Sequence, residues 1–321
     1  AMSMCVWRGG HSVQRWRWRP SPGGGLLPSV ASMSSAVGKR GDWELAWGLL
    51  QGARKSGRRP SMATYRGAIG ACQSSGQWKQ VLEMLAAMRS EGLTLDVLSY
   101  NAAISACGKG EEWQLALGVL EVMARRGVAP NVISYSSAIS ACGRSAQLDS
   151  AMELLRTVTK LGLRPNVISY SSAIAACDRA GQWALAAELL ETMRCGALKP
   201  DVISYNSTIS ACGKGGRWEL ALDLLGAMGR VALHANVISC SSAITACEKG
   251  GRWEQALELL RMMAMLGLRP NVISYNATIS ACEKGERWQE AAHLLAEMEE
   301  NSCGGLAPDA ISYDATLLAL S

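Results

Sequence analysis

The stretch VISYSSAISACGRSAQLDSAMELLRTVTKLGLRPN, residues 132–166, recurs with substitutions every 35 residues along most of the chain. One Tyr, one Cys and one Trp mark nearly every copy, and Leu148 stands where the quoted copy lacks Trp. The marking residues are Tyr65, Tyr100, Tyr135, Tyr170, Tyr205 and Tyr275; Cys72, Cys107, Cys142, Cys177, Cys212, Cys247 and Cys282; and Trp43, Trp78, Trp113, Trp183, Trp218, Trp253 and Trp288. A fixed period between about 20 and 50 residues indicates a solenoid, in which each repeat buries its apolar face against its neighbours. We therefore expect one elongated array.

Each copy contains two segments in which apolar residues recur at helical spacing. In the quoted copy these segments are about residues 132–143 and 148–160. Asn131 precedes the first segment, where an N-cap residue is expected, and Gly162 and Pro165 end the second. The predicted fold class is therefore all-α, a right-handed α-α superhelix (α-solenoid) of 35-residue helix–turn–helix repeats.

The repeat register divides the chain into a basic leader, residues 1–26, and a repeat array, residues 27–321. The first copy is degenerate, because Pro28 and Val30 replace the usual Ile and Tyr. The copy that begins at 272 is about three residues longer than the others, around Ser302–Gly304. The predicted copies are 27–61 (degenerate), 62–96, 97–131, 132–166, 167–201, 202–236, 237–271, 272–309 and 310–321 (partial).

Positive charge is concentrated at the start of the chain. Residues 1–61 hold ten Lys and Arg against two Asp and Glu, whereas the remainder holds 22 against 25. Any affinity of the repeats for nucleic acid must therefore come from where their cations lie. The leader contains several Arg residues and no acidic residue, which is typical of an organelle transit peptide, although a disordered basic tail has the same composition.

Several classes of site and partner are disfavoured. No apolar run approaches the length of a membrane span, so we expect no membrane partner. The periodic cysteines lie one per repeat, roughly 10 Å apart, which is too far for a disulfide or a shared metal ion. They are expected to be buried free thiols, and neither a metal nor another cofactor is predicted. His11, His234 and His293 share no register and predict no catalytic group.

One face of the first helix is not required for the core of its own hairpin. Three positions on this face carry the same kind of residue in successive repeats, and each set is called a series here. A fourth series is the last residue of each repeat. The apolar series is Leu98, Ile133, Ile168, Ile203, Ile238 and Ile273. The short polar series is Asn101, Ser136, Ser171, Asn206, Ser241 and Asn276. The cationic series is Lys109, Arg144, Arg179, Lys214, Lys249 and Lys284. The closing residues are Asn131, Asn166, Asp201, Asn236, Asn271 and Asp309.

One cation per repeat suits a polymer of phosphates, exposed Ile suits stacking on bases, and short polar side chains suit hydrogen bonds to base edges. Each series also has a structural interpretation, which the sequence alone leaves open. The closing Asn and Asp fit N-caps, the short polar series fits a solvated helix face, and the cations fit compensation of the helix dipole. The Trp series is expected to be core residues at the start of the second helix.

The motifs N-V-I-S-Y-N/S, A-C-x-K-G-x-x-W, A-L-x-L-L-x-x-M and G-L-x-P-N/D, with their 35-residue period, resemble the pentatricopeptide repeat (PPR) family. The resemblance covers about residues 27–321 and is closest to P-type arrays of algal and protist organelles. It implies that the chain binds single-stranded RNA, running 5′ to 3′ from its N- to its C-terminus. The apolar series would sandwich the bases and the cations would meet the phosphates. The short polar residue and the closing residue of the same repeat would together select one base.

The resemblance assigns a base to six repeats. Asn101 with Asn131 implies C or U, Ser136 with Asn166 implies A, Ser171 with Asp201 implies G, Asn206 with Asn236 implies C or U, Ser241 with Asn271 implies A, and Asn276 with Asp309 implies U. The implied target is 5′-YAGYAU, in which Y is a pyrimidine. Arg66 with Asp96 fits no such pairing, and the insertion near Ser302 puts the position of Asp309 in question.

These features lead us to expect a sequence-specific RNA-binding protein of organelle RNA processing, stability, editing or translation, in a chloroplast or mitochondrion. Single-stranded RNA is the expected partner, with RNA-processing proteins as further candidates. The resemblance implies no catalysis, because family members that edit or cleave RNA carry additional C-terminal domains with zinc ligands or clustered acids. The alternatives are a helical-repeat scaffold that binds peptides and a subunit whose catalysis lies in a C-terminal extension.

Overall fold

The computed structural model describes residues 43–56, 59–300 and 306–320, and these residues form sixteen helices and no strand. The leader, residues 1–26, and the first part of the degenerate repeat lie outside the described residues. The helices are α2 Trp43–Lys55, α3 Met62–Ser74, α4 Trp78–Ser90, α5 Val97–Lys109, α6 Trp113–Arg125, α7 Val132–Arg144, α8 Leu148–Lys160, α9 Val167–Arg179, α10 Trp183–Cys195, α11 Val202–Lys214, α12 Trp218–Arg230, α13 Val237–Lys249, α14 Trp253–Met265, α15 Val272–Lys284, α16 Trp288–Glu300 and α17 Ala310–Leu320. The all-α solenoid expected from the period is confirmed.

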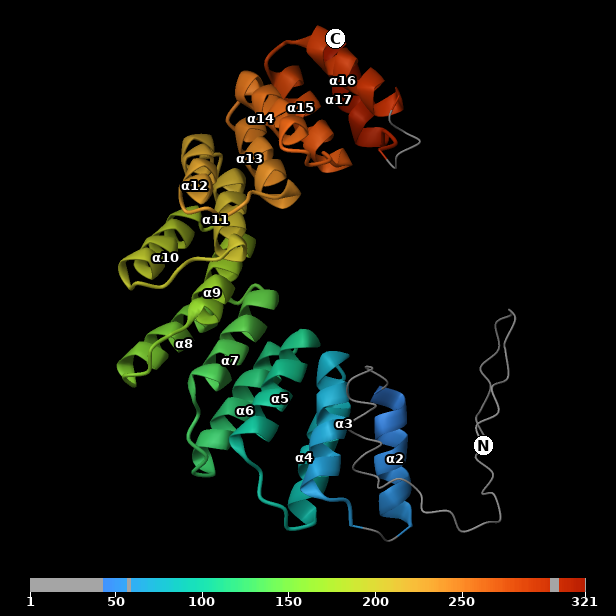
Figure 1. Ribbon diagram of the computed structural model, residues 1–321, viewed down its shortest axis with the longest axis vertical. Helices are drawn as coiled ribbons and strands as arrows, with labels where there is room; N and C mark the ends of the chain where they lie inside the picture. Colours follow the sequence, from blue (N-terminus) through green and yellow to red (C-terminus); the bar gives the residue numbers. More distant parts are fainter. Residues whose placement is uncertain (1–42, 57–58, 301–305, 321) are drawn as a thin grey trace, which may run out of the picture.

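The helices stack in two layers along a curved array (Figure 1). From α3 onward the odd-numbered helices are the first helices of the repeats, and they line the concave side of the curve. The even-numbered second helices lie on the convex side (Figure 1). The face that carries the apolar, polar and cationic series therefore belongs to the inner layer.

Each first helix begins at a capping residue, and the closing residue of the preceding repeat is that cap. Asn131 Oδ1 accepts the backbone N–H of Ser134 at 3.0 Å, and Ser134 Oγ accepts the backbone N–H of Asn131 at 3.2 Å. This capping box satisfies donors that a helix start otherwise leaves unpaired. The N-cap interpretation of the closing residues is thus confirmed, and it leaves a second role for them open.

The core lies between the two layers and is built from the periodic residues. All seven periodic cysteines have no exposed surface, and their thiols are free. Burial raises the pKa of each of these thiols to about 11. Buried Met residues of the second helices, such as Met193 and Met228, lie in the same core. The expectation of buried free thiols is confirmed.

The tryptophans join one repeat to the next at the turn between the helices. Trp183 is half-buried, and the guanidinium of Arg217 lies 4.6 Å from the centre of its ring. A Cβ added at Gly215 would collide with the same ring. The Trp series was predicted to be core residues at the start of the second helix; six of its members pack against the core, and Trp183 also lies at the seam between repeats. Arg217 comes from the following repeat, which a single hairpin does not contain.

The packing at this seam predicts that replacing Gly by Ala has opposite effects on stability at two positions, Gly215 and Gly226. Gly215→Ala should lower the free energy of unfolding by about 1–3 kcal/mol, because the added methyl group overpacks the Trp183 ring. Gly226→Ala is the matched control in the middle of α12, where the nearest atom to the new Cβ is Arg230 Nη1 at 3.6 Å. That change should raise the stability by about 0.5–1 kcal/mol through helix propensity. Urea unfolding of both variants measures the difference, and equal effects would contradict the packing at the seam.

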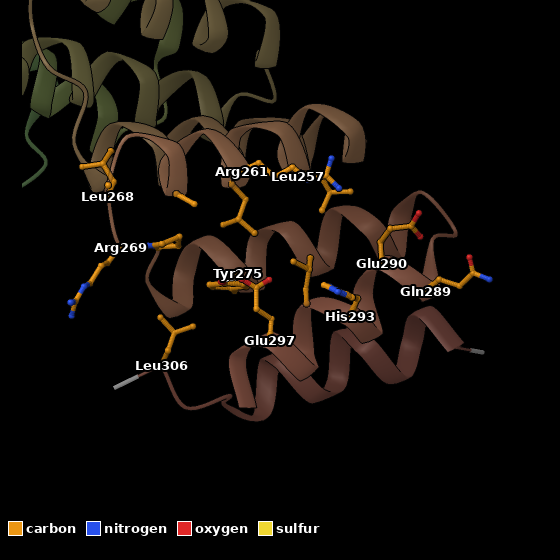
Figure 2. A pocket seen from close by; sticks show the side chains of 15 residues that line it. Leu257, Arg261, Leu268, Arg269, Tyr275, Gln289, Glu290, His293, Glu297 and Leu306 are labelled. Carbon is orange, nitrogen blue, oxygen red and sulfur yellow. Dashed lines mark hydrogen bonds between the residues drawn. The ribbon is translucent and has the colours of Figure 1, made fainter. Parts of the chain in front are cut away.

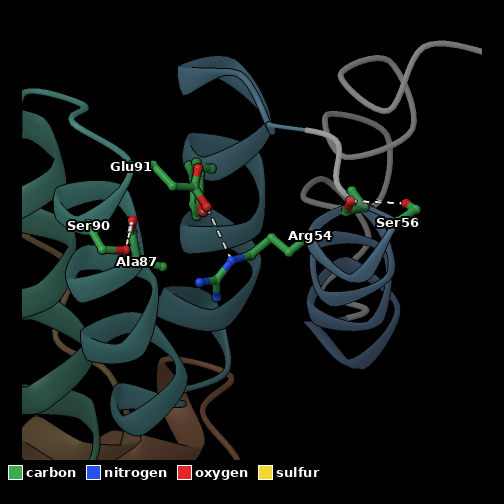
Figure 3. Close-up of polar contacts among 7 residues, drawn as sticks. Arg54, Ser56, Ala87, Ser90 and Glu91 are labelled. Carbon is green, nitrogen blue, oxygen red and sulfur yellow. Dashed lines mark hydrogen bonds and ion pairs between the residues drawn. The ribbon is translucent and has the colours of Figure 1, made fainter.

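The described part of the degenerate first repeat packs through a polar contact. Arg54 Nε in α2 lies 3.2 Å from Glu91 Oε1, at the end of α4 (Figure 3). The Tyr65 hydroxyl donates to the same carboxylate at 2.9 Å. Burial and then this hydrogen bond raise the pKa of Tyr65 to about 12. The contact ties α2 to the first complete repeat.

Candidate nucleic-acid interface

Apolar side chains protrude from the inner layer at one position per repeat. The six residues of the apolar series are between 58% and 64% exposed. They are the second residues of their helices. An exposed branched apolar residue at every repeat costs solubility and contributes nothing to the core, so a ligand surface is the simplest explanation.

In five of the six assigned repeats, hydrogen bonds join the short polar residue to the closing residue 30 or more positions later, directly or through a buried serine. The described hydrogen bonds do not join Ser171 to Asp201. Ser136 Oγ donates to Asn166 Oδ1 at 3.2 Å, and Asn206 Nδ2 donates to Asn236 Oδ1 at 3.2 Å. In two other repeats a buried serine hydrogen-bonds to both members of the pair. Ser134 bridges Asn101 and Asn131, and Ser274 bridges Ser241 and Asn271.

The last complete repeat keeps this pairing despite its longer closing loop. Asn276 Nδ2 donates to Asp309 Oδ1 at 2.9 Å, so the insertion does not move Asp309 out of reach. Arg66 and Asp96, which fit no base assignment, form an ion pair. Burial alone would raise the pKa of Asp96, but hydrogen bonds from Ser99 and the contact with Arg66 outweigh burial and lower that pKa.

The short polar series is far more buried than a solvated helix face. Ser136 is 4% exposed and Asn206 is 9% exposed. The following repeat covers these side chains, which a single helix cannot show.

Five of the six cations donate hydrogen bonds to backbone carbonyls of the preceding repeat, and the described contacts give none for Lys249. Lys109 Nζ donates to Ser74 O at 3.2 Å, and Arg144 Nε donates to Gly108 O at 2.6 Å. These carbonyls lie in the last turn of the preceding first helix, where backbone oxygens lack helical partners. Dipole compensation is thus observed, and it acts on the neighbouring helix.

Two cations of this series are also neutralised by carboxylates. Lys214 Nζ lies 3.0 Å from Asp178 Oδ1, and Lys284 Nζ lies 2.6 Å from Glu248 Oε1. Sequence analysis missed these partners, although each precedes a cation position by one residue. The positive charge of the series is therefore smaller than a count of Lys and Arg suggests.

A cavity lies on the convex side of the array, between α14 and α16. It has a volume of about 880 Å³, and its lining includes Arg261, Tyr275, His293 and Glu297 (Figure 2). The Tyr275 hydroxyl donates to Glu297 Oε1 at 2.9 Å, and burial followed by this bond raises the pKa of Tyr275.

Within the described residues no three His, Cys, Asp or Glu side chains are placed to hold a metal ion. No helix in that part of the chain has the length and hydropathy needed to cross a bilayer.

Comparison with protein families decides the relationship. The family described as the pentacotripeptide-repeat region of PRORP matches residues 51–230, the PPR repeat family matches 235–284, and the PPR repeat matches 273–303. The chain belongs to the pentatricopeptide repeat family. No curated protein matched the chain.

Solved PPR structures share this fold. The PPR protein PPR10 in complex with an 18-nucleotide psaJ RNA element superimposes with a TM-score of 0.75 at 20% identity, over 91% of this chain and 42% of that chain. The structure of PPR10 from maize gives a TM-score of 0.53 at 22% identity, over 91% of this chain and 46% of that chain. This PPR chain thus spans less than half the length of these proteins.

Proposed function

We propose that this PPR array binds single-stranded RNA, one base per repeat, with the RNA running 5′ to 3′ from the N- to the C-terminal repeats. One observation carries the proposal: in five of six repeats of the inner layer, polar pairs joined by hydrogen bonds, directly or through a buried serine, alternate with exposed apolar side chains. Flat bases fit between successive apolar side chains, and base edges then meet the polar pair. Family membership and the RNA-bound PPR10 structures support the choice of RNA.

The base assignments follow the pairs, and the proposed target is 5′-YAGYAU. An Asn that presents N–H donors suits the O2 acceptor that cytosine and uracil share. The cations would meet phosphates. Four of them have no neutralising carboxylate among the described ion pairs: Lys109, Arg144, Arg179 and Lys249. Hydrogen bonds to carbonyls leave the positive charge of Lys109 and Arg179 in place.

The proposed role is occupation of a site on an organelle transcript, in RNA processing, stability, editing or translation. We propose a chloroplast or mitochondrial location and, as further partners, RNA-processing proteins. The array itself is proposed to bind without catalysis and without a cofactor.

Selection of bound RNA from a random single-stranded pool tests this function. We expect enrichment of YAGYAU, and a slope of the logarithm of affinity against the logarithm of salt concentration of about −4 for six phosphate contacts. The slope should be less steep to the extent that Lys214 and Lys284, which are neutralised by carboxylates, displace fewer counterions from the RNA phosphates. Binding without enrichment would refute base selection and leave a phosphate-binding array.

Absence of RNA binding at low salt would refute the proposal and favour the peptide scaffold. The cavity between α14 and α16 is the candidate peptide site in that case, because it is concave and lined by both apolar and charged residues.

A further inference from the structure

We propose that the buried serine at the third position of the following first helix is a positioning residue for base selection. In repeats that carry Asn in the short polar series, its hydroxyl sets which end of the Asn amide faces the RNA. The inference rests on the proposed function, and it adds a residue that never touches the base. The serines concerned are Ser134, Ser239 and Ser312.

The contact is the same in all three Asn repeats. Ser239 Oγ, with no exposed surface, donates to Asn206 Oδ1 at 2.6 Å. Ser134 donates to Asn101 Oδ1 and Ser312 donates to Asn276 Oδ1, each also at 2.6 Å. Ser312 follows Asn276 by 36 residues and not 33, so the contact persists across the insertion.

The surrounding hydrogen bonds give this contact a direction. Ser239 Oγ accepts the backbone N–H of Asn236 at 3.1 Å, which leaves its own proton to donate. Asn236 Oδ1 accepts the backbone N–H of Ser239 at 3.0 Å, so the Asn236 amide is also oriented by the backbone. Asn206 Nδ2 then donates to Asn236 Oδ1 at 3.2 Å. Every donor in this ring has an acceptor.

A rotated Asn206 amide would break the ring at two points. Its oxygen would face Asn236 Oδ1, and two carbonyl oxygens at hydrogen-bond distance repel each other. Its nitrogen would face Ser239, whose hydroxyl would have to exchange the Asn206 acceptor at 2.6 Å for Asn236 Oδ1 at 3.0 Å. The rotated Asn206 oxygen would lack a donor and the shorter Ser239 bond would be lost, so the observed orientation is held. Asn206 therefore keeps Nδ2 beside Asn236, and its second N–H serves a base acceptor.

The repeat that carries Ser171 provides a matched control. Ser204 occupies the equivalent third position, is equally buried, and donates to Asp201 Oδ1 at 2.7 Å. Its described contacts stay within its own capping site, and Ser171 Oγ donates instead to Ile168 O. Both Ser204→Ala and Ser239→Ala remove a serine hydroxyl that bonds to the N-cap side chain of its own helix. Only Ser239→Ala also removes a bond to the short polar residue of the preceding repeat.

The test compares the intact chain with Ser239→Ala, Ser239→Thr and Ser204→Ala. Binding is measured on YAGYAU and on the same RNA with A at the fourth base, the base assigned to Asn206. We expect Ser239→Ala to lose about five- to tenfold of the preference for a pyrimidine there, the effect of one hydrogen bond. Ser239→Thr should restore the preference, because Thr64 occupies the same position with its hydroxyl bonded to Ser61. Ser204→Ala should leave the preference at the fourth base unchanged.

A second readout needs no RNA. The NMR signals of the Asn206 side-chain amide should shift in Ser239→Ala and stay in place in Ser204→Ala. If Ser239→Ala does not fold, Ser134→Ala provides the same comparison at the first base, through Asn101. An intact chain that selects pyrimidines, with a Ser239→Ala variant that selects them equally well, would overturn the inference and leave the proposed function standing. An intact chain that binds no RNA would overturn the proposed function, and the inference with it.

Discussion

Raising the pH from about 8 to about 11 is expected to unfold the repeat array cooperatively. Burial holds the pKa of the seven periodic thiols at about 11, against 9.0 for an exposed thiol. Between these values the unfolded chain releases protons that the folded chain retains, so stability falls as pH rises through this range. The contribution of the thiols is fully present below pH 9 and is lost as pH passes the folded value.

The expected effect is large because the thiols act together. Each shift is worth on the order of 2 kcal/mol, and several of them approach the total stability of a typical domain, about 5–15 kcal/mol. Circular dichroism at a series of pH values, with the melting temperature at each, measures the loss.

Substitution of the thiols is the control for this prediction. The double variant Cys142→Ala and Cys177→Ala lacks two of the titrating thiols. Its stability should therefore fall less steeply as the pH rises from about 9 to about 11. An unchanged pH dependence would assign the alkaline transition to other groups, such as the hydroxyls of Tyr65 and Tyr275, whose pKa values are also raised.

Ser171→Asn is expected to change the third base of the target from G to U, with a change in relative affinity of at least tenfold. The introduced amide would face Asp201, and Ser204 lies at the third position of the next helix. The same three residue types already occur together as Asn276, Asp309 and Ser312. There Asn276 Nδ2 donates to Asp309 Oδ1 at 2.9 Å, and Ser312 Oγ donates to Asn276 Oδ1 at 2.6 Å. One substitution therefore rebuilds an arrangement that the chain already contains.

Competition binding with RNAs that differ only at the third base measures this switch. Lys249→Ala is the control, because loss of an exposed cation should weaken binding to all sequences alike and lower the salt dependence. Lys214 serves less well, since its substitution also breaks the ion pair with Asp178. An unchanged preference for G in Ser171→Asn would contradict the base assignment without affecting the fold.

The local elements of this PPR protein were predictable because they depend on spacing. The predicted start at Val132 and the predicted second helix 148–160 agree with α7 and α8. Tyr135, Ile139 and Cys142 fall on one side of a helix of 3.6 residues per turn, and Ile133 falls on another side. Asn131 and Gly162 are residue types that mark helix ends in any context. The burial of the thiols and the exposure of Ile133 follow from the same helical geometry.

Contacts between repeats were decided by the tertiary structure. The cations bind carbonyls of the preceding helix, Trp183 packs on a turn of the following repeat, and Asn206 is covered by Ser239. Each of these contacts joins residues more than 30 positions apart, and its geometry depends on how far one hairpin rotates on the next. The sequence pattern within one repeat does not depend on this rotation. The hydrogen bonds between repeats, with lengths of 2.6 to 3.2 Å, form at only one rotation. The period therefore identifies which residues recur, and the stacking of the repeats determines what they touch.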